Sequence, residues 1–204
     1  MIITITCVLH GEKVKVLGEN QALLANPTMS LKGMEATQAL IERIRAVGPF
    51  DKVYASRLAR ANDTASVVCM GLNLDWETLK ILGQYADRQD GKTVCYPGHE
   101  DEGYPKWQDH TKRLLTWIHD YYIRYLPLTT DGPDVIIDKP LAQHVLVFTH
   151  RVIIANLIGI TQKISDLDRI KDIARGDKIT QEQIYQFQYN MSDGSLINMS
   201  GKEY

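Results

Sequence analysis

Two runs of apolar, largely β-branched residues each end in a histidine, and they constrain the fold more than any other feature. The first run covers residues 4–9 and ends in His10-Gly11, and the second covers residues 145–149 and ends in His150. Runs that are apolar on both faces are typical of buried parallel strands. Both histidines would then lie at the carboxyl ends of strands, where open α/β sheets bind their ligands. A single His-Gly pair is weak evidence, because a histidine can also simply cap the end of a strand.

The rest of the chain alternates between helical and extended patterns. Ser30 caps a helix that is expected to run to Val47, where Gly48-Pro49 ends it. Helices are also predicted over residues 56–71, 105–125, 152–157 and 165–174, and strands over residues 51–55, 184–189 and 196–199. Residues 75–82 are ambiguous, with a third strand as one interpretation. This alternation predicts a three-layer α/β/α sandwich with a mostly parallel sheet.

The composition fits one domain spanning residues 1–204, with a loop and helix excursion over the site at about residues 83–140. A net charge of -2 argues against nucleic-acid binding. No stretch reaches the ~20 apolar residues of a membrane span, and the apolar start lacks the basic region of a signal peptide. Cys7, Cys69 and Cys95 form neither a zinc-type pair nor an even disulfide set, which indicates a cytoplasmic protein.

An arginine-bearing segment lies between the two histidines in the sequence. The predicted strand at residues 51–55 leads into a helix that carries Arg57 and Arg60 in its first turns. In a parallel sheet, this segment and both histidines would meet at one edge. A neutral imidazole can attack phosphorus, and guanidinium groups and a helix N-terminus bind phosphate oxygens. The arrangement therefore suits a phosphoryl group.

Four sequence blocks resemble the histidine phosphatase superfamily, which has the phosphoglycerate mutase-like fold. The family's Arg-His-Gly-Glu motif reads Leu9-His10-Gly11-Glu12, and its Leu-Thr-x-x-Gly-x-x-Gln-Ala block is similar to residues 29–36. Its Ser-x-Leu-x-Arg-Ala-x-x-Thr-Ala block is matched by residues 56–65, and its late Ser-His-Gly block by Thr149-His150-Arg151. The blocks occur in the family's order and span nearly the whole chain.

The resemblance implies a role for each matching residue. His10 would be the nucleophile that becomes phosphohistidine, and Arg60 would bind the phosphate together with Gly11. His150 would contact the transferred oxygens and support the transition state. The first step would release the substrate alcohol, and water would then hydrolyse the phosphoenzyme. The resemblance implies no metal and no cofactor.

Two departures from the family pattern bear on activity. Leu9 occupies the position of the family's first arginine, which removes one charged phosphate contact. Gln84 holds the place of the usual acid, and an amide cannot protonate a leaving group. Other charged residues could supply the missing acid or the missing cation, although charged residues of this kind are more commonly solvated at a surface. The alternative acids are Asp87, Asp90, Glu100 and Asp101, and the alternative cations are Arg57, Lys13 and Arg151.

Two functions remain open at this stage. The first is a metal-independent phosphomonoesterase that acts on a small phosphorylated substrate or a phosphoprotein. The second is a degenerate family member that binds phosphorylated ligands or a protein partner without turnover, for which Leu9 and Gln84 are the support. A phosphoglycerate mutase is disfavoured, because the Trp and Asn of the mutases' extended first motif are missing after Glu12. The sequence specifies neither the substrate nor the oligomeric state.

Overall fold

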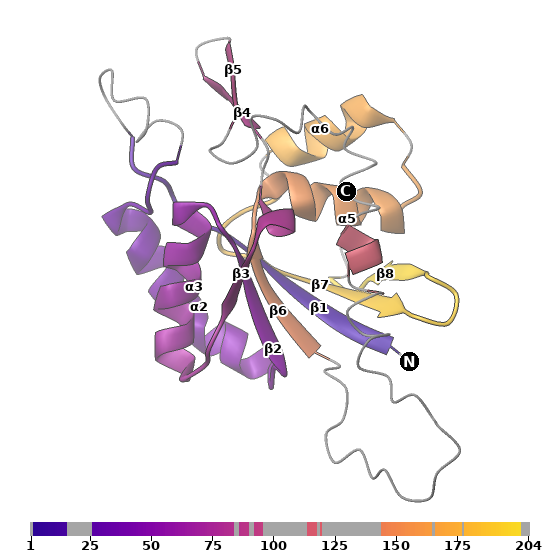
Figure 1. Ribbon diagram of the computed structural model, residues 1–204, viewed down its shortest axis with the longest axis horizontal. Coiled ribbons are helices and arrows are strands. Elements are labelled where there is room, and N and C mark those ends of the chain that lie inside the picture. Colours follow the sequence, from indigo (N-terminus) through magenta and orange to yellow (C-terminus); the bar gives the residue numbers. More distant parts are fainter. Residues whose placement is uncertain are drawn as a thin grey trace, which may run out of the picture.

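The computed structural model describes residues 2–15, 26–83, 86–89, 92–95, 114–117, 119, 144–164, 166–176 and 178–200. A six-stranded sheet lies at its centre, with the strand order β3-β2-β6-β1-β7-β8 (Figure 1). The strands are β1 (Ile2–Leu9), β2 (Lys52–Ser56), β3 (Glu77–Leu79), β6 (His144–Thr149), β7 (Ile184–Asn190) and β8 (Leu196–Asn198). Strands β1, β6, β2 and β3 run parallel, whereas β7 is antiparallel to β1, and β8 to β7. The predicted mostly parallel sheet is confirmed.

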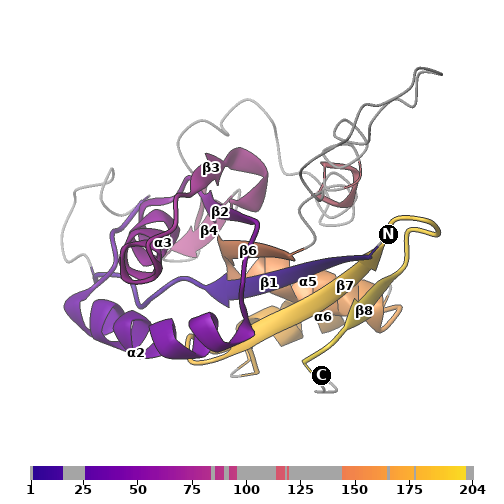
Figure 2. The same cartoon turned by 90° about the horizontal axis from the view of Figure 1, so that it is seen from below.

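Helices cover both faces of this sheet. Helices α2 (Leu31–Val47) and α3 (Ala59–Leu72) lie on one face, and α5 (Arg151–Thr161), with α6 (Leu167–Arg175) packed against it, lies on the other (Figures 1 and 2). One apolar cluster joins alternate residues of β1, such as Ile5 and Leu9, to α5. A second cluster joins Val8 and Phe148 to α2 and α3. The three-layer sandwich is therefore confirmed, with an apolar core on each side of the sheet.

The helix boundaries follow from local sequence signals. The Ser30 hydroxyl accepts a hydrogen bond from the Gly33 N–H at 3.0 Å and caps α2, which ends at Val47 as predicted. Helix α5 begins at Arg151 and is longer than predicted, because it continues through Gly159 to Thr161. A Cβ at Gly159 would lie 2.0 Å from Ile170 Cδ1, so this glycine allows α6 to pack closely on α5.

The segment after α3 differs from the sequence expectation. Residues 77–82 form β3 followed by a short 3₁₀ helix, Lys80–Leu82, which resolves the ambiguity at residues 75–82. Strands β4 (Ala86–Gln89) and β5 (Lys92–Cys95) form a separate hairpin within the expected excursion. The polar composition of the hairpin hides it from hydrophobic patterning. The predicted helix over residues 105–125 is described only at 114–117, which are helical, and at residue 119.

Two further observations concern the general character of the chain. Within the described ranges, none of the helices combines the length and the apolarity that crossing a membrane requires. Cys7 and Cys69 are free and buried, and burial raises the pKa of each thiol to about 12. Both are therefore protonated, unreactive packing residues at neutral pH.

Candidate active site

The carboxyl ends of three adjacent parallel strands bring the predicted site residues together. Leu9 pairs with Thr149 in the β1–β6 register, and the His10 N–H donates to the Thr149 carbonyl at 3.1 Å. His10 and His150 therefore leave the sheet side by side, with their ring centroids 5.0 Å apart. Strand β2 lies on the other side of β6 and leads into α3, whose first turn carries Arg60. The Arg60 Nε–H donates to His10 Nε2 at 3.1 Å, so the three residues form one cluster.

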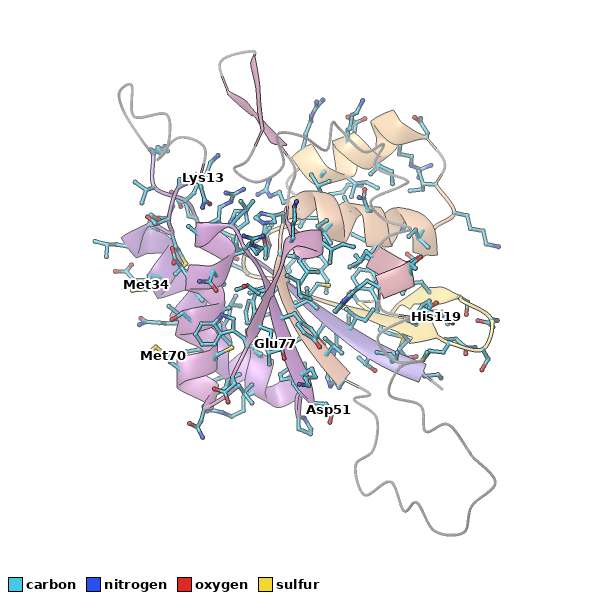
Figure 3. All side chains as sticks on the ribbon, in the orientation of Figure 1. Lys13, Met34, Asp51, Met70, Glu77 and His119 are labelled. Carbon is cyan, nitrogen blue, oxygen red and sulfur yellow. The ribbon has the colours of Figure 1, made fainter. Side chains whose placement is uncertain are left out.

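The turn after β1 is fixed by contacts to α2 and α3. The Gly11 N–H donates to the Thr64 hydroxyl at 2.8 Å, and Thr64 in turn donates to the Arg60 carbonyl at 2.7 Å. A Cβ at Gly11 would lie 2.3 Å from the sulfur of Met29 and 3.0 Å from the carbonyl oxygen of Gly33 in α2, so a larger residue would require Met29 to shift. These contacts tie the position of His10 to the helix that carries Arg60. Figure 3 places Lys13, just beyond this turn, at the opposite end of the sheet from Asp51.

The two ring nitrogens of His10 have different hydrogen-bonding roles. Nδ1 lies 2.8 Å from the Gly11 carbonyl oxygen, which can only accept, so Nδ1 carries the proton. Nε2 accepts from Arg60 and therefore presents a lone pair toward the guanidinium. Burial lowers the pKa of His10 to about 3, and the charges of Arg60, Lys13 and Arg151 act in the same direction. His10 is therefore a neutral imidazole whose Nε2 is unprotonated at physiological pH.

His150 is fully buried at the N-cap position of α5. Its carbonyl accepts hydrogen bonds from the N–H groups of Ile153 and Ile154, which fixes the start of the helix. Its Nε2 lies 2.9 Å from the hydroxyl of Ser56, the last residue of β2. The Ser56 oxygen also accepts from the Leu58 N–H at 3.2 Å. Ser56 therefore holds the His150 ring in place from the neighbouring strand.

Arg60 is 1% exposed and lies in the first turn of α3. The beginning of this helix is supported from outside the helix: the Ala59 N–H donates to Asn26 Oδ1 at 2.8 Å. The amino end of a helix carries partial positive charge, which adds to the charge of Arg60 at an anion site. Sequence reasoning assigned no role to Ser56, Thr64 or Asn26. Ser56 and Thr64 belong to a matched block, whereas no local pattern points to Asn26.

The Leu9 side chain packs in the apolar core and contributes no polar group to this cluster. Its side chain is 2% exposed and belongs to the apolar cluster under α5, together with Cys7 and Tyr185. The family's first cation is therefore replaced by core packing. Among the alternative cations, Lys13 and Arg151 lower the pKa of His10 by their charge. Arg57 is exposed and is not among the groups that shift this pKa.

The structure does not place the candidate acids. Gln84, Asp90, Glu100 and Asp101 lie outside the described residues, and only the backbone of Asp87 is described. No group of three or more His, Cys, Asp or Glu side chains with metal-binding geometry occurs in the described part of the chain. The described histidines outside the cluster contact other side chains: His144 bonds to Thr6 at 2.7 Å and His119 to Tyr189 at 3.3 Å.

Comparison with known families identifies the class to which this fold and cluster belong. Residues 5–174 match the family model described as the histidine phosphatase superfamily, branch 1. The match covers most of the chain and includes His10, Arg60 and His150. The chain belongs to the histidine phosphatase superfamily. The predicted family is thus confirmed. A comparison with curated proteins gives no match.

Solved structures of similar fold extend over nearly the whole chain. A mycobacterial glucosyl-3-phosphoglycerate phosphatase aligns with a TM-score of 0.64 at 15% identity, covering 98% of this chain and 98% of its own. A phosphoserine phosphatase mutant from Entamoeba histolytica, in complex with phosphoserine, gives 0.61 at 11% identity, covering 97% and 95%. A phosphoglycerate mutase from Bacillus anthracis gives 0.62 at 16% identity, covering 97% and 91%. At these identities the similarity establishes the fold alone.

Proposed function

We propose that this protein is a phosphomonoesterase that works through a phosphohistidine on His10. The observation that carries the proposal is the fixed tautomer of His10. Its Nδ1–H is held by the Gly11 carbonyl, and its Nε2 lone pair points at the Arg60 guanidinium. A nucleophilic nitrogen and a phosphate-binding cation are thus 3.1 Å apart before any ligand binds. Family membership and the two phosphatases of similar fold support the same activity.

The proposed first step transfers the phosphoryl group to His10. The substrate phosphate takes over the hydrogen bonds of Arg60, which frees the Nε2 lone pair. Nε2 then forms a bond to phosphorus while the bond from phosphorus to the ester oxygen breaks. Arg60 and His150 would stabilise the equatorial oxygens, whose charge changes in the transition state; their proximity to His10 supports this role. The leaving oxygen takes a proton from an acid or from water.

The proposed second step hydrolyses the phosphoenzyme. Water attacks phosphorus, the bond to Nε2 breaks, and the proton lost by water returns to the donor used in the first step. His10 is regenerated as the neutral Nδ1–H tautomer, which the Gly11 carbonyl favours throughout. Each proposed step uses the imidazole, the guanidinium, water and a proton donor, so the mechanism as proposed requires no metal ion. We propose a cytoplasmic setting on the basis of the sequence, whose three cysteines form no even disulfide set.

The alternative is a binding protein without turnover. The burial of Leu9 in the apolar core favours it, because the family's first cation is absent from β1. Losing a transition-state donor costs about a hundredfold or more in rate. A phosphatase with this loss is slow unless another cation contributes.

The deciding experiment is a phosphatase screen in the presence of a metal chelator. The substrates are sugar phosphates, nucleotides, phosphopeptides and a generic aryl phosphate. Protein quenched during turnover of the aryl phosphate should carry an acid-labile phosphate on the peptide that contains His10, as read by mass spectrometry. His10→Ala should lose both the phosphate and the turnover. Robust turnover by His10→Ala would exclude this mechanism.

A further inference from the structure

Arg151 occupies an unusual position for a cation. It is the first residue of α5, directly after His150, where the family block has glycine. Positive charge is unfavourable at the amino end of a helix, and the first turn of α5 holds no acidic residue to offset it. Across the described chain, the half-buried Arg151 side chain has no hydrogen bond or ion pair. Local structure therefore gives no reason for an arginine here.

The surroundings of Arg151 lead back to the candidate site. Its charge acts on the His10 ring and also on the Tyr185 hydroxyl group of β7. Tyr185 lies directly opposite Cys7 in the β1–β7 register, so its side chain is on the same face of the sheet as those of Cys7 and Leu9. Arg151 thus follows His150 at the strand end next to that of His10, and its charge reaches both His10 and Tyr185, whose side chain shares a face of the sheet with that of Leu9.

On the basis of the proposed function, we infer that Arg151 is a phosphate-binding residue that replaces the cation lost at Leu9. The cation has moved from the end of β1 to the end of the adjacent strand, β6. Because β1 and β6 are parallel and in register, a guanidinium from either strand end can reach the same phosphoryl group. Leu9 is then free to pack in the core, where it is 2% exposed.

The other two alternative cations fit this role less well. Arg57 is exposed and is not among the charges that act on His10. Lys13 acts on His10, but an ammonium group cannot supply the planar pair of donors that a guanidinium offers to two phosphate oxygens. Arg60, which already bonds to His10, and Arg151 would then both contact the phosphate.

The test measures anion binding and turnover separately. Calorimetry gives the Kd of orthovanadate and of inorganic phosphate, and an aryl phosphate gives kcat and KM. Arg151→Gln should weaken vanadate binding by about tenfold to a hundredfold, the loss expected for a charged hydrogen bond. Arg151→Lys should recover only part of it. Arg169→Gln, which removes an exposed arginine of α6, is the matched control and should bind as the wild type does.

If the phosphate-binding cation has moved from residue 9 to residue 151, moving it back should restore binding. Arg151→Gly should bind weakly, and adding Leu9→Arg to it should restore binding, because the pair recreates the family arrangement. NMR titration should show that Arg151→Gln raises the pKa of His10, which checks independently that the charge of Arg151 reaches the His10 ring. Circular dichroism and thermal melting confirm that each variant is folded. If the double variant fails to fold, the Arg151→Gln and Arg151→Lys binding data decide alone.

The outcomes separate this inference from the proposed function. If the wild type turns over substrate and Arg151→Gln binds vanadate and turns over normally, Arg151 is not a phosphate ligand although the protein is a phosphatase. If vanadate binding depends on Arg151 while turnover is absent, the inference holds and the phosphatase function fails. Wild-type protein that binds neither anion would overturn the inference, because no phosphate site then exists for Arg151 to serve.

Discussion

The low pKa of His10 predicts a measurable pH dependence of stability. The folded protein holds His10 neutral down to about pH 3, mainly because the half-buried ring loses solvation of its charged form, with the neighbouring cations adding to the effect. The unfolded chain takes up the proton at the ordinary pKa of 6.5. Below pH 6.5 the unfolded state therefore binds more protons than the folded state, and stability falls as the pH is lowered.

The magnitude follows from the two pKa values. Between pH 6.5 and pH 3 the loss approaches about 1.4 kcal/mol per pH unit. At pH 4.5 it reaches about 2.5 kcal/mol, and this figure changes little for any folded pKa below about 4. Choosing pH 4.5 thus makes the result insensitive to how far below 4 the folded pKa lies.

The assay compares wild type with His10→Gln in urea unfolding at pH 8 and at pH 4.5. The other titrating groups are shared, so the change in the stability difference between the two pH values isolates His10. The variant should gain about 2.5 kcal/mol relative to wild type on acidification. NMR titration of the His10 ring in the folded protein gives an independent check. A stability difference that is the same at both pH values would show that His10 titrates normally and would refute the buried, cation-flanked site.

Three further predictions concern other parts of the chain. Gly33→Ala places a Cβ 2.5 Å from the Glu12 carbonyl oxygen, so it should lower the free energy of unfolding by about 1–3 kcal/mol in urea titration. Asn156 is 1% exposed and its amide has no hydrogen-bond partner in the described chain, so Asn156→Leu should raise stability by about 1–3 kcal/mol, and a lower Tm would contradict this. Gln84→Glu should speed hydrolysis of alkyl phosphates more than aryl phosphates in steady-state kinetics, because only poor leaving groups need a proton donor. Equal acceleration of both ester classes would remove residue 84 from the acid position.

The convergence of His10, His150 and Arg60 could be predicted from the sequence, whereas their catalytic roles stay a prediction. His10 and His150 each follow an apolar run, and parallel strands place such ends together, so their convergence needed only strand polarity and adjacency. Arg60 followed because the helix after β2 starts at the same edge of the sheet. Ser56 and Asn26 were missed because their partners, His150 and Ala59, are distant in the sequence, and hydrogen bonds of this kind leave no periodic signal.

The position of Leu9 shows what sequence reasoning cannot reach. The sequence revealed that a cation is missing, and it offered three replacements without ranking them. Only the strand register and the burial of Leu9 show on which face of the sheet the side chain of residue 9 lies, and so where the family's arginine is missing. The β4–β5 hairpin was missed for another reason, since its short polar strands lack the apolar alternation that predicts strands.

The electrostatics of the site affect the two proposed steps differently. Cations close to His10 and the burial of its ring make the imidazole a weak base, which lowers its reactivity as a nucleophile toward phosphorus. The same weak basicity makes it a good leaving group when water attacks the phosphoenzyme. If Gln84 holds the acid position as predicted, transfer from an alkyl ester would be the slow step of the proposed mechanism, and hydrolysis of the phosphohistidine would follow quickly. Phosphohistidine should therefore accumulate only with substrates such as aryl phosphates, whose leaving groups depart without a proton.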